Sequence, residues 1–421
     1  MGYLVSFVFI LIFLYFYIYK KEGFFSPICF FTLLWSVISL GACFCNRWGI
    51  PSVSEKTWII IFIGVVGFAV GCFLGRYVRI KKNEIRTDYI DIKCETSINL
   101  KGVLLFFIIT APFLFLMLYE AILLIRNGWT LREIRSAYYG INGYDMYWNT
   151  SIYMRIGEKF FLSPFKVAII PITIATCIRE KPNLKLILIA VLIIITDSIT
   201  TGGRFILLYV AVEIVAALAI VNRNGKIKKY VRNASIVLLI ISLMGIIYIT
   251  NKRGVYNNWI NKIYEYFFCC IPLFDHYVPS MDTYTYGTAS LNGILNPIIS
   301  ILSRFINIST PFERSIINDY NIQQAVQLSD TINTNAFVTS FFYTYLDFGL
   351  IGTFLGMMVF GIWSKKEYRF LEYSCSTSNL AIYLLVIQGI IKTIQHMPFC
   401  ASDYFIGLVL LYLFSKRKKV V

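Results

Sequence analysis

Arginines in the polar stretches of this chain are the side chains best suited to chemistry. Arg132 and Arg135 lie in one stretch, Arg204 in a short turn, and Arg253 and Arg314 in a later stretch. A guanidinium presents a planar fork of donors that binds phosphate at two points and tolerates partial loss of water. The set therefore favours an anionic ligand. The alternative is that these arginines extend toward water or pair with nearby acids, namely Glu133, Glu158, Glu265 and Glu313.

The turn at residues 200–204 reads Thr-Thr-Gly-Gly-Arg and separates two apolar runs. Gly202 and Gly203 allow the backbone to approach a ligand closely, and the start of the following helix attracts an anion. Arg204 completes a candidate anion site. An ordinary glycine turn with an arginine that extends toward water fits the same residues.

A candidate acid–base pair is Asp275-His276, in the later polar stretch. Histidine is the usual general base near neutral pH, so we expect this pair to act in catalysis. An incidental loop histidine is the alternative. The chain has two histidines, and the other is His396.

Several ionisable residues lie within or beside apolar runs, where charge is costly and tends to serve function. Four lie near run ends, placed to line a shared cavity: Glu120, Asp197, Lys392 and Asp403. Glu213 and Asp347 lie deeper. Asp347 is placed to cap a broken helix or to hold a basic partner, and a structural role fits each of these residues equally well.

The sequence lacks the usual signatures of metal and nucleotide sites. Two histidines and the absence of an Asp-x-Asp pair predict no catalytic metal, and no cofactor is expected. Walker A, Gly-x-Ser-x-Gly and Cys-x-x-Cys patterns are also absent, which disfavours ATP-driven transport and serine hydrolysis.

The elements that must position these residues lie in a membrane. Of the 421 residues, 57% are hydrophobic and 15% are charged, whereas a soluble domain carries about 25% charge. A transmembrane helix needs about 20 mostly apolar residues. We predict a single-domain, all-α, polytopic membrane protein with about 11 transmembrane helices, at residues 3–19, 24–44, 58–75, 102–124, 160–177, 184–198, 205–221, 234–249, 337–363, 380–393 and 402–414.

Charge in the connecting loops predicts the orientation. With the N-terminus outside and the C-terminus cytoplasmic, most of the 39 basic residues lie in short cytoplasmic loops, as the positive-inside rule requires. The net charge of +16 then reflects attraction to anionic membrane lipid, and no nucleic-acid partner is expected. Two long extracytoplasmic loops remain, at about 125–159 and 251–336, the second between spans 8 and 9 and rich enough in apolar residues to form interfacial helices.

Two patches of the sequence resemble bacterial oligosaccharide repeat-unit polymerases, the family of O-antigen and capsular polysaccharide polymerases. One patch is the turn at 202–204. The other joins residues 334–340 (Thr-Asn-Ala-Phe-Val-Thr-Ser) to residues 345–352 (Tyr-Leu-Asp-Phe-Gly-Leu-Ile-Gly). The arrangement of spans and the long late loop are similar as well. An Arg-x10-Gly pattern of one such polymerase matches Arg132 and Gly143, and a second copy in the late loop is absent.

The resemblance implies metal-independent glycosyl transfer at the outer face of the bacterial cytoplasmic (inner) membrane. Repeat units linked to undecaprenyl pyrophosphate would be polymerised into O-antigen or capsular polysaccharide, with a chain-length regulator protein as a further partner. Asp275 or His276 would accept the proton of the acceptor hydroxyl. The pyrophosphate would be held by Arg132, Arg135, Arg204, Arg253 and Arg314.

Three other functions fit parts of the sequence. An O-antigen ligase would share the donor and the membrane face, and His276 keeps that interpretation open. A flippase for lipid-linked oligosaccharide is disfavoured, because transporters place polar sites at the membrane midplane and often show repeated halves. An adaptor role is disfavoured by the arginines of the outer loops.

Overall fold

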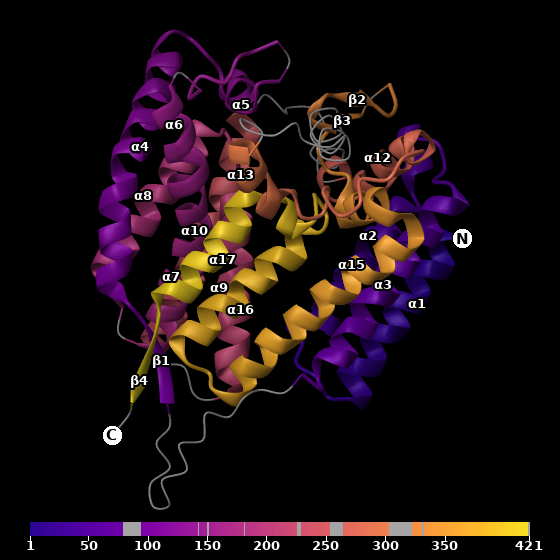
Figure 1. Ribbon diagram of the computed structural model, residues 1–421, viewed down its shortest axis with the longest axis horizontal. Coiled ribbons are helices and arrows are strands. Elements are labelled where there is room, and N and C mark those ends of the chain that lie inside the picture. Colours follow the sequence, from indigo (N-terminus) through magenta and orange to yellow (C-terminus); the bar gives the residue numbers. More distant parts are fainter. Residues whose placement is uncertain are drawn as a thin grey trace, which may run out of the picture.

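The computed structural model describes residues 1–78, 94–141, 143–149, 151–180, 182–224, 229–252, 264–302, 322–330 and 332–419. These residues form mainly helices that run between two ends of the molecule (Figure 1). One end carries α5 (Leu131–Tyr139), α12 (Cys270–Tyr277) and the paired strands β2 (Val326–Gln327) and β3 (Asn333–Thr334), and we name it the loop end. The other carries the paired strands β1 (Cys94–Ile98) and β4 (Ser415–Lys419) near the C-terminus, and we name it the tail end.

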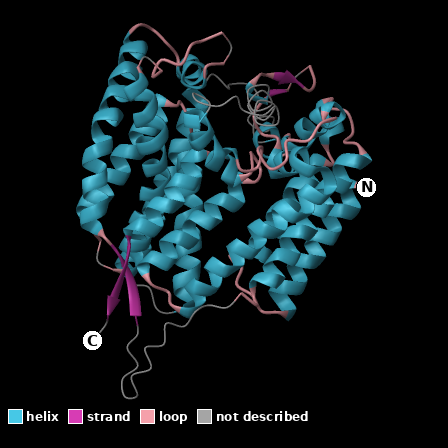
Figure 2. Cartoon of the chain, in the orientation of Figure 1, coloured by secondary structure: helices cyan, strands magenta, loops and turns pink. Residues whose placement is uncertain are grey.

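The long helices fall into two groups (Figures 1 and 2). The group near the N-terminus contains α1 (Gly2–Leu14), α2 (Pro27–Ala42), α3 (Glu55–Gly75) and α15 (Thr339–Tyr373). The second group contains α4 (Leu100–Arg126), α7 (Ser163–Arg179), α8 (Leu184–Thr200), α9 (Phe205–Asn224), α10 (Lys229–Lys252), α16 (Thr377–Lys392) and α17 (Ser402–Phe414). Contacts of α16 with α2 and α15 join the two groups.

Apolar composition accounts for most of these helices, and each of the predicted spans is helical over most of its length. Within the described residues, seven helices are long and apolar enough to cross a membrane. They are Gly2–Tyr19, Glu55–Gly75, Leu100–Arg126, Ile152–Arg179, Phe205–Arg223, Val231–Thr250 and Thr339–Tyr373. Because α2, α16 and α17 are apolar but shorter, the predicted span count remains a prediction. The mostly helical membrane class is confirmed.

The closest helix packing joins α3 to α15. A Cβ atom on Gly71 would lie 2.1 Å from the Met358 carbonyl oxygen, and one on Gly361 would lie 2.3 Å from the Phe68 carbonyl oxygen. Glycine is therefore required at both positions, since the two backbones touch there. This contact fixes the position of α15, whose first turns border the site described below.

Inside α15 the helix is interrupted immediately after Asp347. Phe348 has φ −150° and Gly349 has φ +62°, the latter in a region that favours glycine. The Asp347 carboxylate accepts four hydrogen bonds of 2.6–3.0 Å from the preceding loop, donated by Thr285 Oγ1 and the backbone N–H groups of Gly287, Ala289 and Ser290. Asp347 thus caps a broken helix and ties the loop to it.

The loop end contains short elements between the long helices. They are α5 (Leu131–Tyr139), α6 (Ile152–Ile156), α12 (Cys270–Tyr277) and α13 (Asn292–Leu302), a 3-10 turn at Cys45–Trp48, two more at Val278–Ser280 and Pro398–Cys400, and a π-helical turn at Gly157–Leu162. A further π-helical turn, Tyr15–Tyr19, extends α1 at the tail end. Helices therefore do form in both predicted long loops.

Two small antiparallel sheets were not predicted. At the tail end β1 (Cys94–Ile98) pairs with β4 (Ser415–Lys419), so that Cys94 lies opposite Lys419. At the loop end β2 (Val326–Gln327) pairs with β3 (Asn333–Thr334). Strands of two residues are too short to show an alternation of apolar and polar residues. The β1–β4 pairing joins segments far apart in the chain, so no local sequence pattern predicts either sheet.

Asp347 provides a test of the loop anchor. We expect Asp347→Ala to lower the stability of the purified protein by about 2–4 kcal/mol, because three buried donors and the half-buried Gly287 N–H lose their acceptor. Asp347→Asn should be intermediate, since one amide oxygen still accepts. Asp282→Ala, an exposed carboxylate in the same loop, is the matched control. Equal thermal unfolding temperatures for Asp347→Ala and Asp282→Ala would contradict the anchoring role.

Candidate functional site

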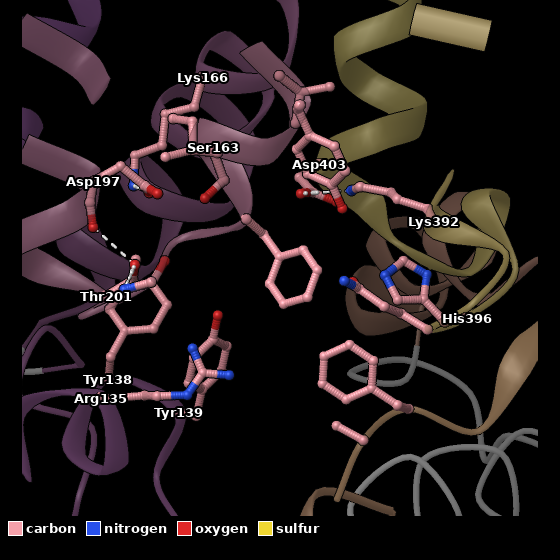
Figure 3. Close-up of a pocket in the computed structure, with 18 of the residues that line it drawn as sticks. Arg135, Tyr138, Tyr139, Ser163, Lys166, Asp197, Thr201, Lys392, His396 and Asp403 are labelled. Atoms are coloured by element: carbon pink, nitrogen blue, oxygen red, sulfur yellow. Dashed lines mark hydrogen bonds and ion pairs between the residues drawn. The ribbon is translucent and has the colours of Figure 1, made fainter. Parts of the chain in front are cut away.

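A cavity of about 320 Å³ lies at the loop end. Its first wall comes from α5, α7 and the junction between α8 and α9. Its second wall comes from Gln323, residues 335–337, Tyr343, the end of α16 and the start of α17. In the close-up of Figure 3, Arg135, Lys166 and Asp197 lie across the cavity from Lys392, His396 and Asp403. Segments from distant parts of the sequence therefore meet at one place.

The glycine turn positions the first wall. Gly202 has φ +53°, and a Cβ atom there would lie 2.5 Å from the Leu131 carbonyl oxygen at the start of α5. The Thr201 hydroxyl stabilises the turn, since it donates to the Asp197 carbonyl oxygen at 2.8 Å and accepts from Gly203 N–H at 2.9 Å. The close approach of α5 to this turn brings Arg135 to the cavity.

The amino end of α5 is specified locally. The Thr130 side chain accepts from Glu133 N–H, and the Glu133 carboxylate accepts from Thr130, which is a capping box. The hydrogen bonds from Thr130 lower the pKa of Glu133. Arg135 projects from this helix with its guanidinium 5.0 Å from the centre of the Tyr139 ring. Within the described residues no acid lies within ion-pair distance of Arg135.

A buried ion pair lies deeper in the first wall. Lys166 Nζ on α7 lies 3.0 Å from Asp197 Oδ1 on α8, and the two side chains are 7% and 17% exposed. Nearby, the Tyr138 hydroxyl donates to Glu158 at 2.6 Å, and Ser163 donates to the same carboxylate oxygen. Burial and the charge of Glu158 raise the pKa of Tyr138. Paired charges are the form in which ionised groups persist away from water.

A second ion pair lies on the opposite wall. Lys392 Nζ at the end of α16 lies 3.5 Å from Asp403 Oδ2 at the start of α17. Lys392 is 7% exposed and Asp403 is 34% exposed, so the carboxylate is the accessible partner. The same pair therefore closes the second wall and presents a carboxylate oxygen to the cavity.

His396 lies beyond the end of α16 and lines the cavity. Its Nδ1 lies 3.0 Å from the Met397 carbonyl oxygen. Since a carbonyl only accepts, Nδ1 carries the proton and Nε2 keeps its lone pair. Burial and the charge of Lys392 lower the pKa of His396 to about 4, so the ring is neutral near pH 7.

The remaining lining is uncharged and combines amides with aromatic rings. Gln388 is 3% exposed, and its Oε1 has no hydrogen-bond partner within the described structure. Ala336 has φ +63°, a strained conformation for a residue with a Cβ atom. Strain of this kind is often found at functional sites. The other amides and rings of the lining are Gln323, Asn335 and Gln395 with Tyr139, Phe205, Tyr209, Phe337 and Tyr343.

The cavity is suited to an anionic ligand with a polar, uncharged portion. Arg135, Lys166 and Lys392 face two carboxylates, so one positive charge remains in the lining, and Arg135 carries it without a described acidic partner. Amides and rings supply hydrogen bonds and flat apolar faces. Within the part of the chain that the structure describes, no three His, Cys, Asp or Glu side chains converge on a metal position.

The structure separates the predicted arginines. Arg135 lines the cavity, whereas Arg132 is exposed on the same helix. Arg204 is not in the lining, because its guanidinium lies 4.0 Å from the centre of the Tyr266 ring and donates to Thr250. Arg253 and Arg314 lie outside the described residues. Of the turn glycines, Gly203 lines the cavity and Gly202 packs against α5.

The predicted acid–base pair lies away from the cavity. The Asp275 carboxylate on α12 accepts from Ser54 N–H at 3.1 Å and Thr57 Oγ1 at 2.5 Å, and so braces the start of α3. His276 is exposed and contacts the Tyr277 ring. Neither residue lines the cavity.

Some cavity residues had a sequence signal and others had none. Asp197, Lys392 and Asp403 were expected near a shared cavity and do line it, whereas Glu120 does not. Lys166 was missed, although a lysine within the apolar run of α7 is itself a signal. Gln388 and Asn335 carry no such signal, because single amides occur throughout polar and apolar segments.

The chain matches no protein-family model, no curated protein and no solved structure.

The lowered pKa of His396 predicts a pH dependence of stability. Between pH 6.5 and about 4 the unfolded chain binds a proton at this residue that the folded protein does not bind. Stability should therefore fall as the pH is lowered through this window. We expect His396→Gln to reduce that fall, measured as the unfolding temperature at pH 7 and pH 4.5. An unchanged pH slope in the variant would contradict burial of a neutral ring.

Proposed function

We propose that this protein is a membrane glycosyltransferase that polymerises oligosaccharide repeat units linked to undecaprenyl pyrophosphate. The product would be O-antigen or capsular polysaccharide. The loop end would face the outside of a bacterial inner membrane, the orientation that the loop charges favour. The single observation that carries the proposal is the loop-end cavity, where an unpaired guanidinium, two ion pairs and an amide–aromatic surface meet.

Arg135 is the residue we assign to the pyrophosphate. Two N–H donors of one guanidinium match two phosphate oxygens, and the charge-assisted bonds strengthen as negative charge develops on the leaving group. The Lys166–Asp197 pair lies behind it and holds the wall in place. Because the cation is already fixed by α5 and the Tyr139 ring, little reorganisation is needed when the ligand binds.

The sugar would occupy the amide–aromatic side of the cavity. Sugar hydroxyls both donate and accept, as side-chain amides do, and the apolar face of a pyranose packs on aromatic rings. Gln388 supports this assignment, because it lines the cavity and its buried Oε1 has no donor within the described structure. The lipid tail would lie against the apolar helix faces outside the cavity.

His396 and Asp403 are the candidates for proton transfer in place of Asp275 and His276. The acceptor hydroxyl would lose its proton to His396 Nε2 as its oxygen forms the new bond to the anomeric carbon of the donor. The bond from that carbon to the pyrophosphate oxygen breaks, and undecaprenyl pyrophosphate leaves with the electron pair. Asp403, 34% exposed, would stabilise the protonated ring or accept the proton itself.

The function is tested by deleting the gene in its native host and separating the surface polysaccharide on a gel. A polymerase deletion removes the ladder and leaves a single repeat unit attached. Complete loss of attached glycan would instead indicate a ligase or a flippase and would overturn the proposal. Restoration of the ladder by the wild-type gene is the control.

Arg135 and Arg132 form a matched pair for testing the site, since they lie one turn apart on α5. We expect Arg135→Ala to abolish the ladder and Arg135→Lys to shorten it, because lysine keeps the charge but not the paired donors. A loss of about 2.7–4 kcal/mol of transition-state stabilisation corresponds to roughly 10²–10³-fold in rate.

The exposed Arg132 should tolerate alanine with a normal ladder. Immunoblots must show equal amounts of each variant in the membrane. A normal ladder from Arg135→Ala would rule out its role in binding the donor.

A further inference from the structure

Glu213 is an ionisable side chain that is buried without a hydrogen-bond partner in the described structure. It lies in the middle of α9, is fully buried at 0% exposure, and neither of its carboxyl oxygens has a hydrogen-bond partner. A carboxylate without partners in an apolar interior is strongly destabilised, and residues of this kind in spanning helices usually serve a function. The catalytic proposal above makes no use of it.

The inward face of α9 connects Glu213 to the cavity. Ile206 and Tyr209 line the loop-end cavity, and Glu213 follows Tyr209 by four residues, on the same helix face. One helical turn places Glu213 about 6 Å below Tyr209 along the axis. Tyr209 also interacts with the Gln395 side chain, another residue of the cavity lining.

A second cavity, of about 330 Å³, lies at the tail end and is lined in part by Ile220 and Arg223 of α9. Ile220 lies about 10 Å below Glu213 along the helix axis. Ala216 and Ala217, both buried, occupy the intervening part of the same face. The apolar stretch therefore separates Glu213 from the tail-end cavity, whereas a tyrosine hydroxyl lies on the side of the loop-end cavity.

No cation compensates Glu213 within the described residues. The elements packed against α9 are α7, α8, α10 and α16, and none of them contributes an ion pair or a hydrogen bond to this carboxyl group. The titratable groups that sense it electrostatically are Tyr209 on α9 and Tyr404 on α17. Tyr404 is engaged elsewhere, since its hydroxyl donates to the Leu385 carbonyl oxygen at 2.8 Å.

We propose that Glu213 is a proton-binding site in the bundle core that exchanges its proton with the loop-end cavity past Tyr209. The neutral acid removes the cost of an unpaired carboxylate. For exchange, Glu213 gives its proton to the Tyr209 oxygen while the Tyr209 hydroxyl proton passes to a water in the cavity, which leaves a carboxylate and a hydronium ion. The reverse steps, with a proton from the cavity, restore the neutral acid and water. The inference does not depend on the identity of the substrate.

Infrared difference spectroscopy of the purified full-length protein tests the proposal. The spectrum of the wild type minus that of Glu213→Gln should contain a C=O band of a protonated carboxyl group at pH 7. The band should shift to lower frequency in D₂O, since the acid proton exchanges with the cavity. Glu158→Gln is the matched control, because Glu158 is also buried but accepts hydrogen bonds from Tyr138 and Ser163. It should leave the band unchanged.

Tyr209→Phe tests the route, and we expect it to slow the D₂O shift without removing the band. Absence of the band from the wild type would show an ionised Glu213 and overturn the proposal. A band that does not shift in D₂O, or that shifts equally fast in Tyr209→Phe, would overturn exchange past Tyr209. If Glu213→Gln does not fold, Glu213→Asp keeps the carboxyl group and should move the band instead of removing it.

Discussion

The arrangement of this protein depends on one constraint, which is that polar groups inside an apolar helix bundle must find partners within the protein. Water is absent there, and an unpaired donor, acceptor or charge is costly. The buried polar groups accordingly occur in sets. Asp347 gathers four donors at the break in α15, and Lys166 pairs with Asp197 between α7 and α8. These sets fix where helices break and how their ends meet.

The loop-end cavity is one of the regions where this pairing is incomplete. Arg135 lacks an acidic partner among the described residues, and the buried Oε1 of Gln388 lacks a donor. Arg135 is held on α5 beside the Tyr139 ring and Gln388 is held on α16, which limits the reorganisation needed when a ligand binds. The ion pairs on either wall supply rigidity more than binding, because each cation is largely neutralised by its own carboxylate.

The helices were readable from the sequence because a long apolar run is a local signal, and each predicted span is helical. The site was only partly readable. Asp197, Lys392 and Asp403 stand out against apolar neighbours, but which loop residues face them depends on contacts between distant segments. Arg135 and Arg132 are indistinguishable in sequence, and the close approach of Gly202 to Leu131 decides which of them reaches the cavity. Asp275-His276 formed a plausible pair in sequence, yet Ser54 and Thr57 at the N-terminus of α3 donate hydrogen bonds to the Asp275 carboxylate.

The carboxyl groups of the chain show how the surroundings set the role of one functional group. Asp347 and Asp275 have their oxygens occupied by donors from the backbone and hydroxyl groups, which makes them braces. Asp403 accepts a hydrogen bond from Tyr404 N–H on one oxygen and pairs with Lys392 through the other, but at 34% exposure it stays accessible to a ligand. Glu213 has neither partner nor exposure. Because an ionised carboxylate would be costly there, we infer that Glu213 is the neutral acid. It lies one helical turn from a cavity residue, so its role is to bind a proton, whereas Asp347 and Asp275 stabilise helix ends.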